Sequence, residues 1–288
     1  MKNLVHTYKK VLTKIDYSCV IARLQVLNLA KITHQSNLSH VSKLARLLRT
    51  LIIFKPTQPM SNNDGRAFTL AEVLITLGII GVIAALTIPT LVKNSEEIAT
   101  VSRVKKAYSI FSQAYISAET NEGPIDTWNW IASDDGTGAT NALNILAKYL
   151  KISKNCGTAT GCLPDVSIKN LDNLNSINQN NDTKYAKAIL DDGTLLIIIS
   201  RSPNCKNSRG TTLALQNICG FISVDTNGFQ GPNQVGKDYF DFYITRYGII
   251  PIGTVDEISY PPSNCNKADT GKACTAWVLQ KGNMDYLD

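Results

Sequence analysis

Residues 68–89 read FTLAEVLITLGIIGVIAALTIP and are the most apolar part of the chain. The only ionisable residue among them is Glu72. The 21 residues from 68 to 88 form a helix of about 31 Å at about 1.5 Å per residue, which matches a hydrocarbon core of roughly 30 Å. A buried helix of this length is expected to show a polar stripe, and none is present. The stretch therefore predicts a helix that crosses a membrane once.

The residues around Glu72 follow a known pattern. Ala67-Phe68-Thr69-Leu70-Ala71-Glu72, followed by the apolar run, resembles the prepilin cleavage and methylation motif of type IV pilins and type II secretion pseudopilins. The resemblance implies that prepilin peptidase cuts between Ala67 and Phe68 and methylates the new Phe68 amine. Ala67 departs from the usual Gly before the cut but is also small. Glu72 and Pro89 become the fifth and twenty-second residues of the processed chain, where these pilins also carry Glu and Pro.

The resemblance also implies how the subunits assemble. In a filament of this family the apolar helices bundle without lipid, and Glu72 pairs with the Phe68 amine of a neighbouring subunit. A charge pair is worth more in such a dry environment than on a surface, so we expect this pair to set the axial register. Pro89 lacks the amide hydrogen of a helical bond, and we expect it to kink the helix or to melt it locally.

Charge and histidine are distributed unevenly along the 288 residues, of which 44% are hydrophobic. Residues 1–59 hold ten lysines and arginines against the single acid Asp16, a net charge of +9. Residues 60–288 hold 19 basic and 22 acidic side chains, a net charge of −3. This balance makes nucleic acid an unlikely partner of the main part of the chain. All three histidines lie before residue 60, which excludes imidazole chemistry downstream.

The segment before the cut, 1–67, is long for a leader of this family. Met60 opens the eight-residue sequence MSNNDGRA, which is a leader of the expected kind. We therefore expect translation to start at Met60 and residues 1–59 to be a mis-called start. The alternative is a long, positively charged leader that stays on the cytoplasmic side.

The remaining sequence predicts an α+β fold in which a long N-terminal helix packs on an antiparallel β-sheet head. Apolar residues recur every three or four positions after Pro89, and the helix is expected over 68–121. The head is expected over 122–288, with a short helix at 141–151. Strands are predicted at three places and a long surface loop at one: the strands at 194–200, 218–224 and 239–246, and the loop at 153–183.

Six cysteines remain once Cys19 in the doubtful segment is set aside. They form three sequence pairs: Cys156 with Cys162, Cys205 with Cys219, and Cys265 with Cys274. We expect these three local disulfides, although six cysteines allow fifteen pairings. A zinc site is the alternative, but histidine and Cys-x-x-Cys are both absent after residue 60. Disulfides indicate an oxidising compartment, as for a head outside the cytoplasm.

Residues 224–240 contain the most distinctive loop of the head, VDTNGFQGPNQVGKDYF. Similar stretches occur in prepilin-like proteins, and some pseudopilins bind calcium in this part of the head. Asp225, Asn227 and Asp238 offer the hard oxygen ligands that calcium prefers. The alternative is a loop stabilised by Gly, Asn and Pro turns without a metal, which explains most of the residue types.

These observations predict a structural protein that is not an enzyme and has no catalytic residues. It is expected to be a pilin or pseudopilin of a type IV pilus or a type II secretion-like filament, which needs no cofactor apart from possible calcium. Its partners would be copies of itself, prepilin peptidase, and the inner-membrane assembly platform with its ATPase. The expected location is the inner membrane, with the head outside, and later the filament. The alternatives are a minor pilin with a ligand-binding head for adhesion or DNA uptake, for which Trp128, Trp130 and Trp277 are weak hints, and a membrane-anchored enzyme that uses Asp191, Asp192 and Asp241.

Overall fold

The computed structural model describes residues 69–131, 136–174 and 176–288. The predicted leader 1–67 and Phe68 lie outside the described residues, as does the side chain of Glu72. The chain divides into two units, Met1–Val73 and Leu74–Asp288, and the second of these is compact. The second unit contains the whole sheet and most of the long helix.

Helix α4 (Leu70–Glu122) is the first described element and is 53 residues long. Pro89 was expected either to kink the helix or to melt it locally. The helix continues through Pro89, so it does not melt there. Thr87 Oγ1 donates a hydrogen bond to the Ile83 carbonyl at 2.9 Å, and Thr90 Oγ1 donates one to the Thr87 carbonyl at 3.0 Å. These hydroxyls are satisfied within the helix, as polar side chains of an apolar segment need to be.

The head is built on a six-stranded antiparallel sheet with the order β1-β4-β5-β6-β7-β8. The strands are β1 (Ile152–Gly157), β4 (Tyr185–Leu190), β5 (Leu195–Ser200), β6 (Ile218–Asp225), β7 (Tyr239–Thr245) and β8 (Gly248–Pro251). Two short strands, β2 (Ile168–Lys169) and β3 (Ser176–Ile177), form a second sheet. The helical elements of the head are η2 (Ile125–Thr127), α5 (Thr137–Leu146), η3 (Pro262–Asn264), α6 (Cys274–Lys281) and η4 (Asp285–Leu287).

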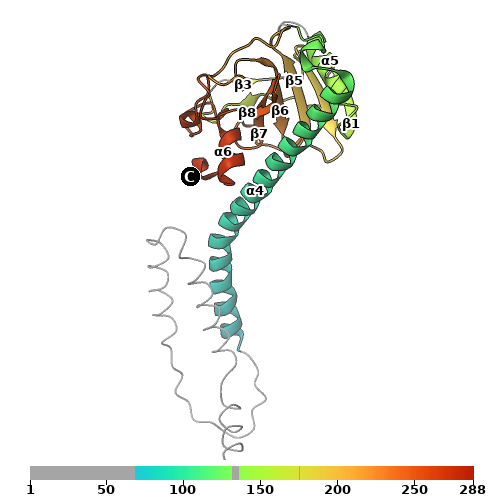
Figure 1. The fold of residues 1–288 in the computed structure, drawn as a ribbon. Coiled ribbons are helices and arrows are strands. Elements are labelled where there is room, and N and C mark those ends of the chain that lie inside the picture. Colours follow the sequence, from blue (N-terminus) through green and yellow to red (C-terminus); the bar gives the residue numbers. More distant parts are fainter. Residues whose placement is uncertain (1–68, 132–135, 175) are drawn as a thin grey trace, which may run out of the picture. The chain divides into compact units, whose positions relative to one another are not determined.

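α4 packs on one face of this sheet (Figure 1). Val104, Phe111 and Ala118 are buried on it at intervals of seven residues, which is two helical turns. Phe111 and Tyr108 both contact the ring of Phe242 on β7, with ring centroids 6.2 and 6.1 Å apart. The predicted arrangement of a long helix on an antiparallel sheet is therefore confirmed.

Leu163 and Val235 from loops and Ile168 from β2 pack on the opposite face of the sheet. Lys187 on β4 is fully buried there, and its Nζ donates hydrogen bonds to the carbonyls of Thr158 and Asn180 at 3.0 and 2.7 Å. Burial lowers the pKa of this lysine. Because a buried ammonium group needs partners, the two carbonyls hold the loop after β1 and the segment between β3 and β4 against the sheet.

Two details of the predicted head are wrong. The short helix was expected at 141–151 but occupies Thr137–Leu146, because Gly138 and Ala139 fit closely against the sheet. The region predicted as a loop at 153–183 contains most of β1 and all of β2 and β3. The predicted strands at 194–200, 218–224 and 239–246 correspond to β5, β6 and β7 within one residue at each end.

Candidate functional site

The N-terminal part of α4 is an apolar surface that nothing in the second unit covers. Leu74, Ile75 and Ile80 have 60–61% of their surface exposed. The most apolar 18-residue window of the helix has a mean hydropathy of 2.3, and none of it is buried. Within the described part of the chain, α4 is the one helix long and apolar enough to cross a membrane. An exposed apolar surface of this kind indicates contact with lipid or with other subunits.

The predicted processing and assembly residues surround the start of this helix. Glu72 lies in the first turn of α4, and Pro89 lies within it. Ala67 and Phe68 precede the described residues. The structure thus places Glu72 and Pro89 on one continuous helix and leaves the predicted cleavage site untested.

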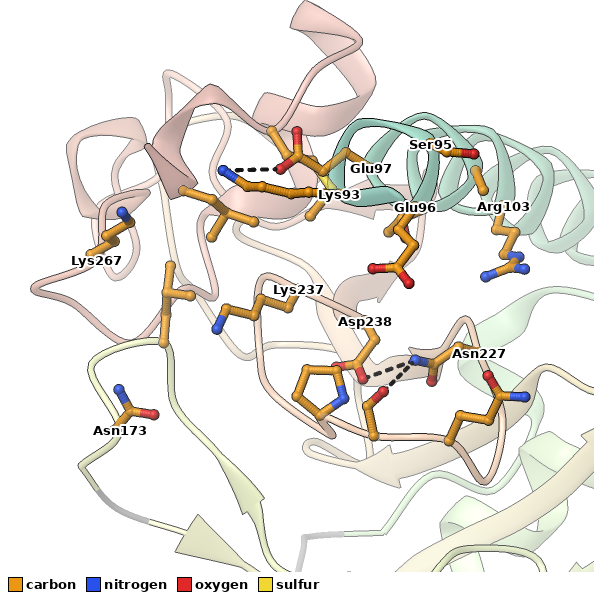
Figure 2. Close-up of a pocket in the computed structure, with 18 residues that line it drawn as sticks. Lys93, Ser95, Glu96, Glu97, Arg103, Asn173, Asn227, Lys237, Asp238 and Lys267 are labelled. Atoms are coloured by element: carbon orange, nitrogen blue, oxygen red, sulfur yellow. Dashed lines mark hydrogen bonds and ion pairs between the residues drawn. The ribbon is translucent and has the colours of Figure 1, made fainter. Parts of the chain in front are cut away.

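A groove of about 730 Å³ lies where α4 passes the loop between β6 and β7 (Figure 2). α4 contributes Lys93, Glu96 and Arg103 to its lining, and the loop contributes Asn227 and Asp238. In Figure 2, Glu96 and Asp238 face the groove from opposite sides. Lys93 forms ion pairs with Glu97 and Asp288 at 3.6 and 2.8 Å, so the last residue of the chain is held against the helix.

Asp238 organises the loop that carries the predicted calcium ligands. Its Oδ2 accepts hydrogen bonds from Asn233 N and Asn227 Nδ2 at 2.8 and 3.2 Å, and its Oδ1 accepts one from Gln234 N at 2.7 Å. Asn227 N donates in turn to Asp225 Oδ1 at 3.2 Å. The three predicted residues Asp225, Asn227 and Asp238 are therefore joined in one network, and much of that network serves the loop's own backbone.

The two carboxylates of this network are buried, which is unusual for acidic side chains. Asp225 and Asp238 are 2% and 3% exposed. Burial raises the pKa of Asp225 to about 8, and the neighbouring charge of Asp238 adds to the shift. Burial also raises the pKa of Asp238 above its ordinary value. Two buried acids in electrostatic contact are costly when both are ionised.

Two amide oxygens next to these acids have no hydrogen-bond partner. They are Asn227 Oδ1 and Asn233 Oδ1, and both atoms are buried. Asn233 lines a cavity of about 10 Å³ together with Asp225 and Gln179, whereas Asn227 and Asp238 line the larger groove. Sequence reasoning missed Asn233, because an Asn next to Pro232 is an ordinary turn residue until its oxygen is seen to be unpaired.

The oxygen atoms present suit a hard cation only in part. Two carboxylates and two amide oxygens are the ligand types that calcium takes. The described residues, however, contain no group of three or more Asp, Glu, His or Cys side chains arranged to hold a metal ion. The donor set is therefore short of the charge that the tightest calcium sites have.

Three disulfides fasten the head, and they join the partners that the sequence predicted. They are Cys156–Cys162, Cys205–Cys219 and Cys265–Cys274. Cys205 and Cys219 are both fully buried, and their bridge ties the loop after β5 to strand β6. Cys274 begins α6, so the third bridge holds that helix to the segment before it.

Comparison with known proteins gives one match. A family model described as the prokaryotic N-terminal methylation motif matches residues 62–88, which include the start of α4. No curated protein and no solved structure matches the chain significantly.

Proposed function

We propose that this pilin-like protein, whose methylation motif is characteristic of type IV pilins and pseudopilins, is a structural subunit of a type IV pilus or a type II secretion-like filament. The observation that carries the proposal is the pairing of this motif with an exposed apolar helix that continues into a disulfide-bonded head. A helix of this kind has two possible environments, lipid before assembly and the apolar helices of other subunits afterwards.

Processing is the first step of the proposed pathway. The methylation motif implies prepilin peptidase as a partner. We place the cut between Ala67 and Phe68, so that 1–67 is removed as the leader, and we place the methyl group on the Phe68 amine. The processed chain would then consist of the helix 68–121, which spans the membrane at 68–88, and the head 122–288.

Assembly is the second step, and it depends on Glu72. In the lipid-free centre of a filament an unpaired carboxylate is strongly penalised, and a pair with the Phe68 amine of the next subunit removes the penalty. Because only one axial offset brings the two groups together, the pair sets the register between subunits. The inner-membrane assembly platform and its ATPase would supply the force that extracts the helix from lipid.

The proposed location follows from the same features. The protein would be a single-pass protein of the inner membrane, with its head on the outer side, until it enters the filament. The three disulfides support an oxidising compartment for the head.

An enzymatic role has little support among the carboxylates that it would need. Asp191 and Asp192 lie in the turn between β4 and β5, and Asp192 is paired with Lys106 of α4 at 2.7 Å. Asp241 is buried and bonded to Ser223. These contacts favour structural roles for all three acids.

The test of the proposed assembly is the substitution Glu72→Ala. We expect the variant to be processed and inserted as the wild type is, but to form no filaments, because it lacks the partner of the Phe68 amine. The measurement is the amount of subunit in sheared filaments, compared with the amount of processed subunit in membranes. Glu96→Ala, which removes an exposed acid from the same helix, is the matched control and should assemble normally. Normal filaments from Glu72→Ala would overturn the charge-pair argument.

The amount of subunit in wild-type filaments distinguishes two forms of the proposed function. Abundant subunit would indicate a major subunit, and trace amounts would indicate a minor subunit with a ligand-binding head.

A second proposal is that Asp225, Asn227 and Asp238 bind calcium, with Asn233 as a further ligand. It is supported by the two unpaired amide oxygens beside the buried acid pair. Calcium would relieve the repulsion between the carboxylates and supply a partner for an unpaired amide oxygen. We expect calcium, but not magnesium, to raise the melting temperature of the full chain in detergent, and we expect Asp225→Asn to abolish the increase. Equal melting temperatures with calcium and with a chelator would contradict this proposal.

A further inference from the structure

The charge of the head is locally very different from its average. Residues 193–224 contain Arg201, Lys206 and Arg209 and no acid. This segment comprises β5, the disulfide-bonded loop and β6 without its last residue, Asp225. Residues 60–288 therefore contain a basic segment although their net charge is −3.

The first cation of this region, the guanidinium group of Arg201, packs against an aromatic ring. Phe221 lies on β6, on the face of the sheet opposite α4, and its ring centroid is 5.0 Å from that of Tyr243 on β7. The guanidinium carbon of Arg201 sits 5.1 Å from the centroid of Phe221. The Nε atom of Arg201 is buried without a hydrogen-bond partner. Arg201 is thus held in place by its ring contact and retains hydrogen-bonding capacity.

Two more cations border the same aromatic cluster. Lys272 Nζ lies 5.2 Å from the ring centroid of Tyr260, which packs in one cluster with Phe221 and Tyr243. Arg209 Nη1 is 3.4 Å from Ser259 Oγ, next to Tyr260, and its Nε bonds Asn207 Oδ1 at 3.2 Å. We call Arg201, Arg209 and Lys272, with the rings that carry them, the basic aromatic cluster.

None of these three cations has an ion-pair partner within the described residues. Other cations of the head are paired; Arg246, for example, binds Asp126 at 2.6 Å. The acids beneath the cluster are Asp241 and Glu257, which are buried and bonded to Ser223 and Tyr243. Burial raises the pKa of both acids, while Lys272 acts to lower the pKa of Asp241 and Arg209 acts to lower that of Glu257, so each of these two cations has a buried acid within electrostatic reach. By sequence, the nearest acids that have some exposure to solvent are Asp191 and Asp192 before Arg201, and Asp269 before Lys272.

We propose that the basic aromatic cluster is a binding surface for the phosphate backbone of duplex DNA. The cations are half-exposed; Arg201 and Lys272 are held against rings and Arg209 by hydrogen bonds, so they are ordered before a ligand arrives and lose little side-chain entropy on binding. A guanidinium group matches a phosphate with two parallel hydrogen bonds.

The arrangement of the rings favours backbone contacts over base contacts. The face of Phe221 that Arg201 covers is closed to a stacking base. What the cluster offers is positive charge held in place at the protein surface, and duplex DNA carries one negative charge per about 1.7 Å of its axis. Binding is therefore expected to be independent of sequence and sensitive to salt.

Phe221 and Tyr243 lie on the face of the sheet opposite α4, whereas Tyr260 packs against the apolar clusters of both faces. If the subunit forms a filament around α4, which is the function proposed above, the cluster faces outward and is repeated along the filament. The repeats would then add by avidity. Binding by the single subunit does not depend on the filament, so the two proposals fail independently.

The experiment measures binding of a fluorescein-labelled duplex of about 20 base pairs to the full-length protein in neutral detergent between 50 and 200 mM salt. Arg201, Arg209 and Lys272 are replaced together by Gln. We expect the variant to bind at least tenfold more weakly at 50 mM salt, and the slope of log K against log salt to fall by about 2.7 for three lost phosphate contacts. The matched control replaces Arg103, Lys105 and Lys237 by Gln, and it should bind as the wild type does.

Three results would overturn the proposal. One is a wild-type salt slope near zero, which needs no variant and is unaffected if the triple substitution unfolds the head. A second is an equal loss of affinity in the two triple variants, since that would mean that net charge alone is responsible. A third is binding of an acidic polysaccharide such as polygalacturonate without binding of the duplex. Equal melting temperatures of the variant and the wild type, together with the expected loss, support the assignment.

Discussion

At the scale of single residues, two tryptophans pack together inside the head. Trp128 and Trp130 are both 2% exposed, and their rings are stacked with centroids 6.5 Å apart. Their indole N–H groups donate to the carbonyls of Gly123 and Ile125. They close the core beyond the end of α4 rather than bind a partner.

Gly220 is the residue that makes room for Trp130. A Cβ atom at position 220 would lie 2.6 Å from the Trp130 ring and 2.5 Å from the Ile199 carbonyl oxygen. We therefore expect Gly220→Ala to lower the free energy of unfolding by about 1–3 kcal/mol, as overpacking does. Urea unfolding of the full chain in detergent measures this difference in the free energy of unfolding. Gly81→Ala is the control, because nothing lies within 4 Å of that position and Ala favours a helix. Equal stability of Gly220→Ala and the wild type would contradict the packing described for Trp130.

The pKa of Asp225 predicts how stability depends on pH. Its value in the folded protein is about 8, raised from an ordinary value of 3.8. A raised pKa means that the folded state binds the proton more tightly than the unfolded state. The stabilising contribution is thus complete below pH 4 and is lost as the pH rises from 4 to 8. Without calcium, we expect the wild type to lose more stability between pH 5 and pH 8 than Asp225→Asn does.

Melting temperatures of both proteins at the two pH values, in the presence of a chelator, test this expectation. Asp225→Asn should keep the part of the dependence that comes from the other buried acids, Asp238, Asp241 and Glu257. The same pH dependence in both proteins would show that Asp225 is ionised in the folded state. Bound calcium should reduce the difference, because it favours the ionised form.

At the scale of elements, the sequence predicted the helix and the strands whose apolar residues follow a regular pattern. α4 and the strands β5, β6 and β7 have long apolar patterns, and these were predicted nearly to their ends. β1 and β4 were missed because they contain polar residues such as Lys154 and Lys187. Lys187 can lie in a buried strand because its ammonium group donates hydrogen bonds to the carbonyls of two loop residues. The sequence pattern of the strand does not reveal these partners. Ile98 fits the helical stripe by spacing but is 72% exposed, because helical spacing alone does not reveal how far the head extends along α4.

The disulfides are expected to contribute unequally. Cys205–Cys219 closes a loop of 14 residues and is buried, whereas Cys156–Cys162 closes one of 6. The chain-entropy model assigns them about 3 and about 2 kcal/mol. Replacing Cys205 and Cys219 by Ala should therefore lower the melting temperature more than replacing Cys156 and Cys162 does. The reverse order in thermal unfolding would contradict the anchoring role given to the buried bridge.

At the scale of the whole molecule, the candidate site was predictable where it depends on a contiguous motif. The match to residues 62–88 rests on neighbouring positions, which a sequence displays directly. The unpaired oxygen of Asn233 and the basic aromatic cluster depend on residues that only folding brings together. The net charge of residues 60–288 made nucleic acid an unlikely partner, whereas the arrangement of the cations supports the opposite inference.

The state of the N-terminus tests the central claim most directly. Intact-mass measurement of the subunit isolated from the membranes of the producing cells, followed by fragmentation of its N-terminal peptide, identifies the first residue and its modification. The proposed function predicts a chain that begins with N-methylated Phe68 and carries three disulfides. A mature chain that retains any residue before Phe68 would contradict processing at this motif and, with it, the proposed filament.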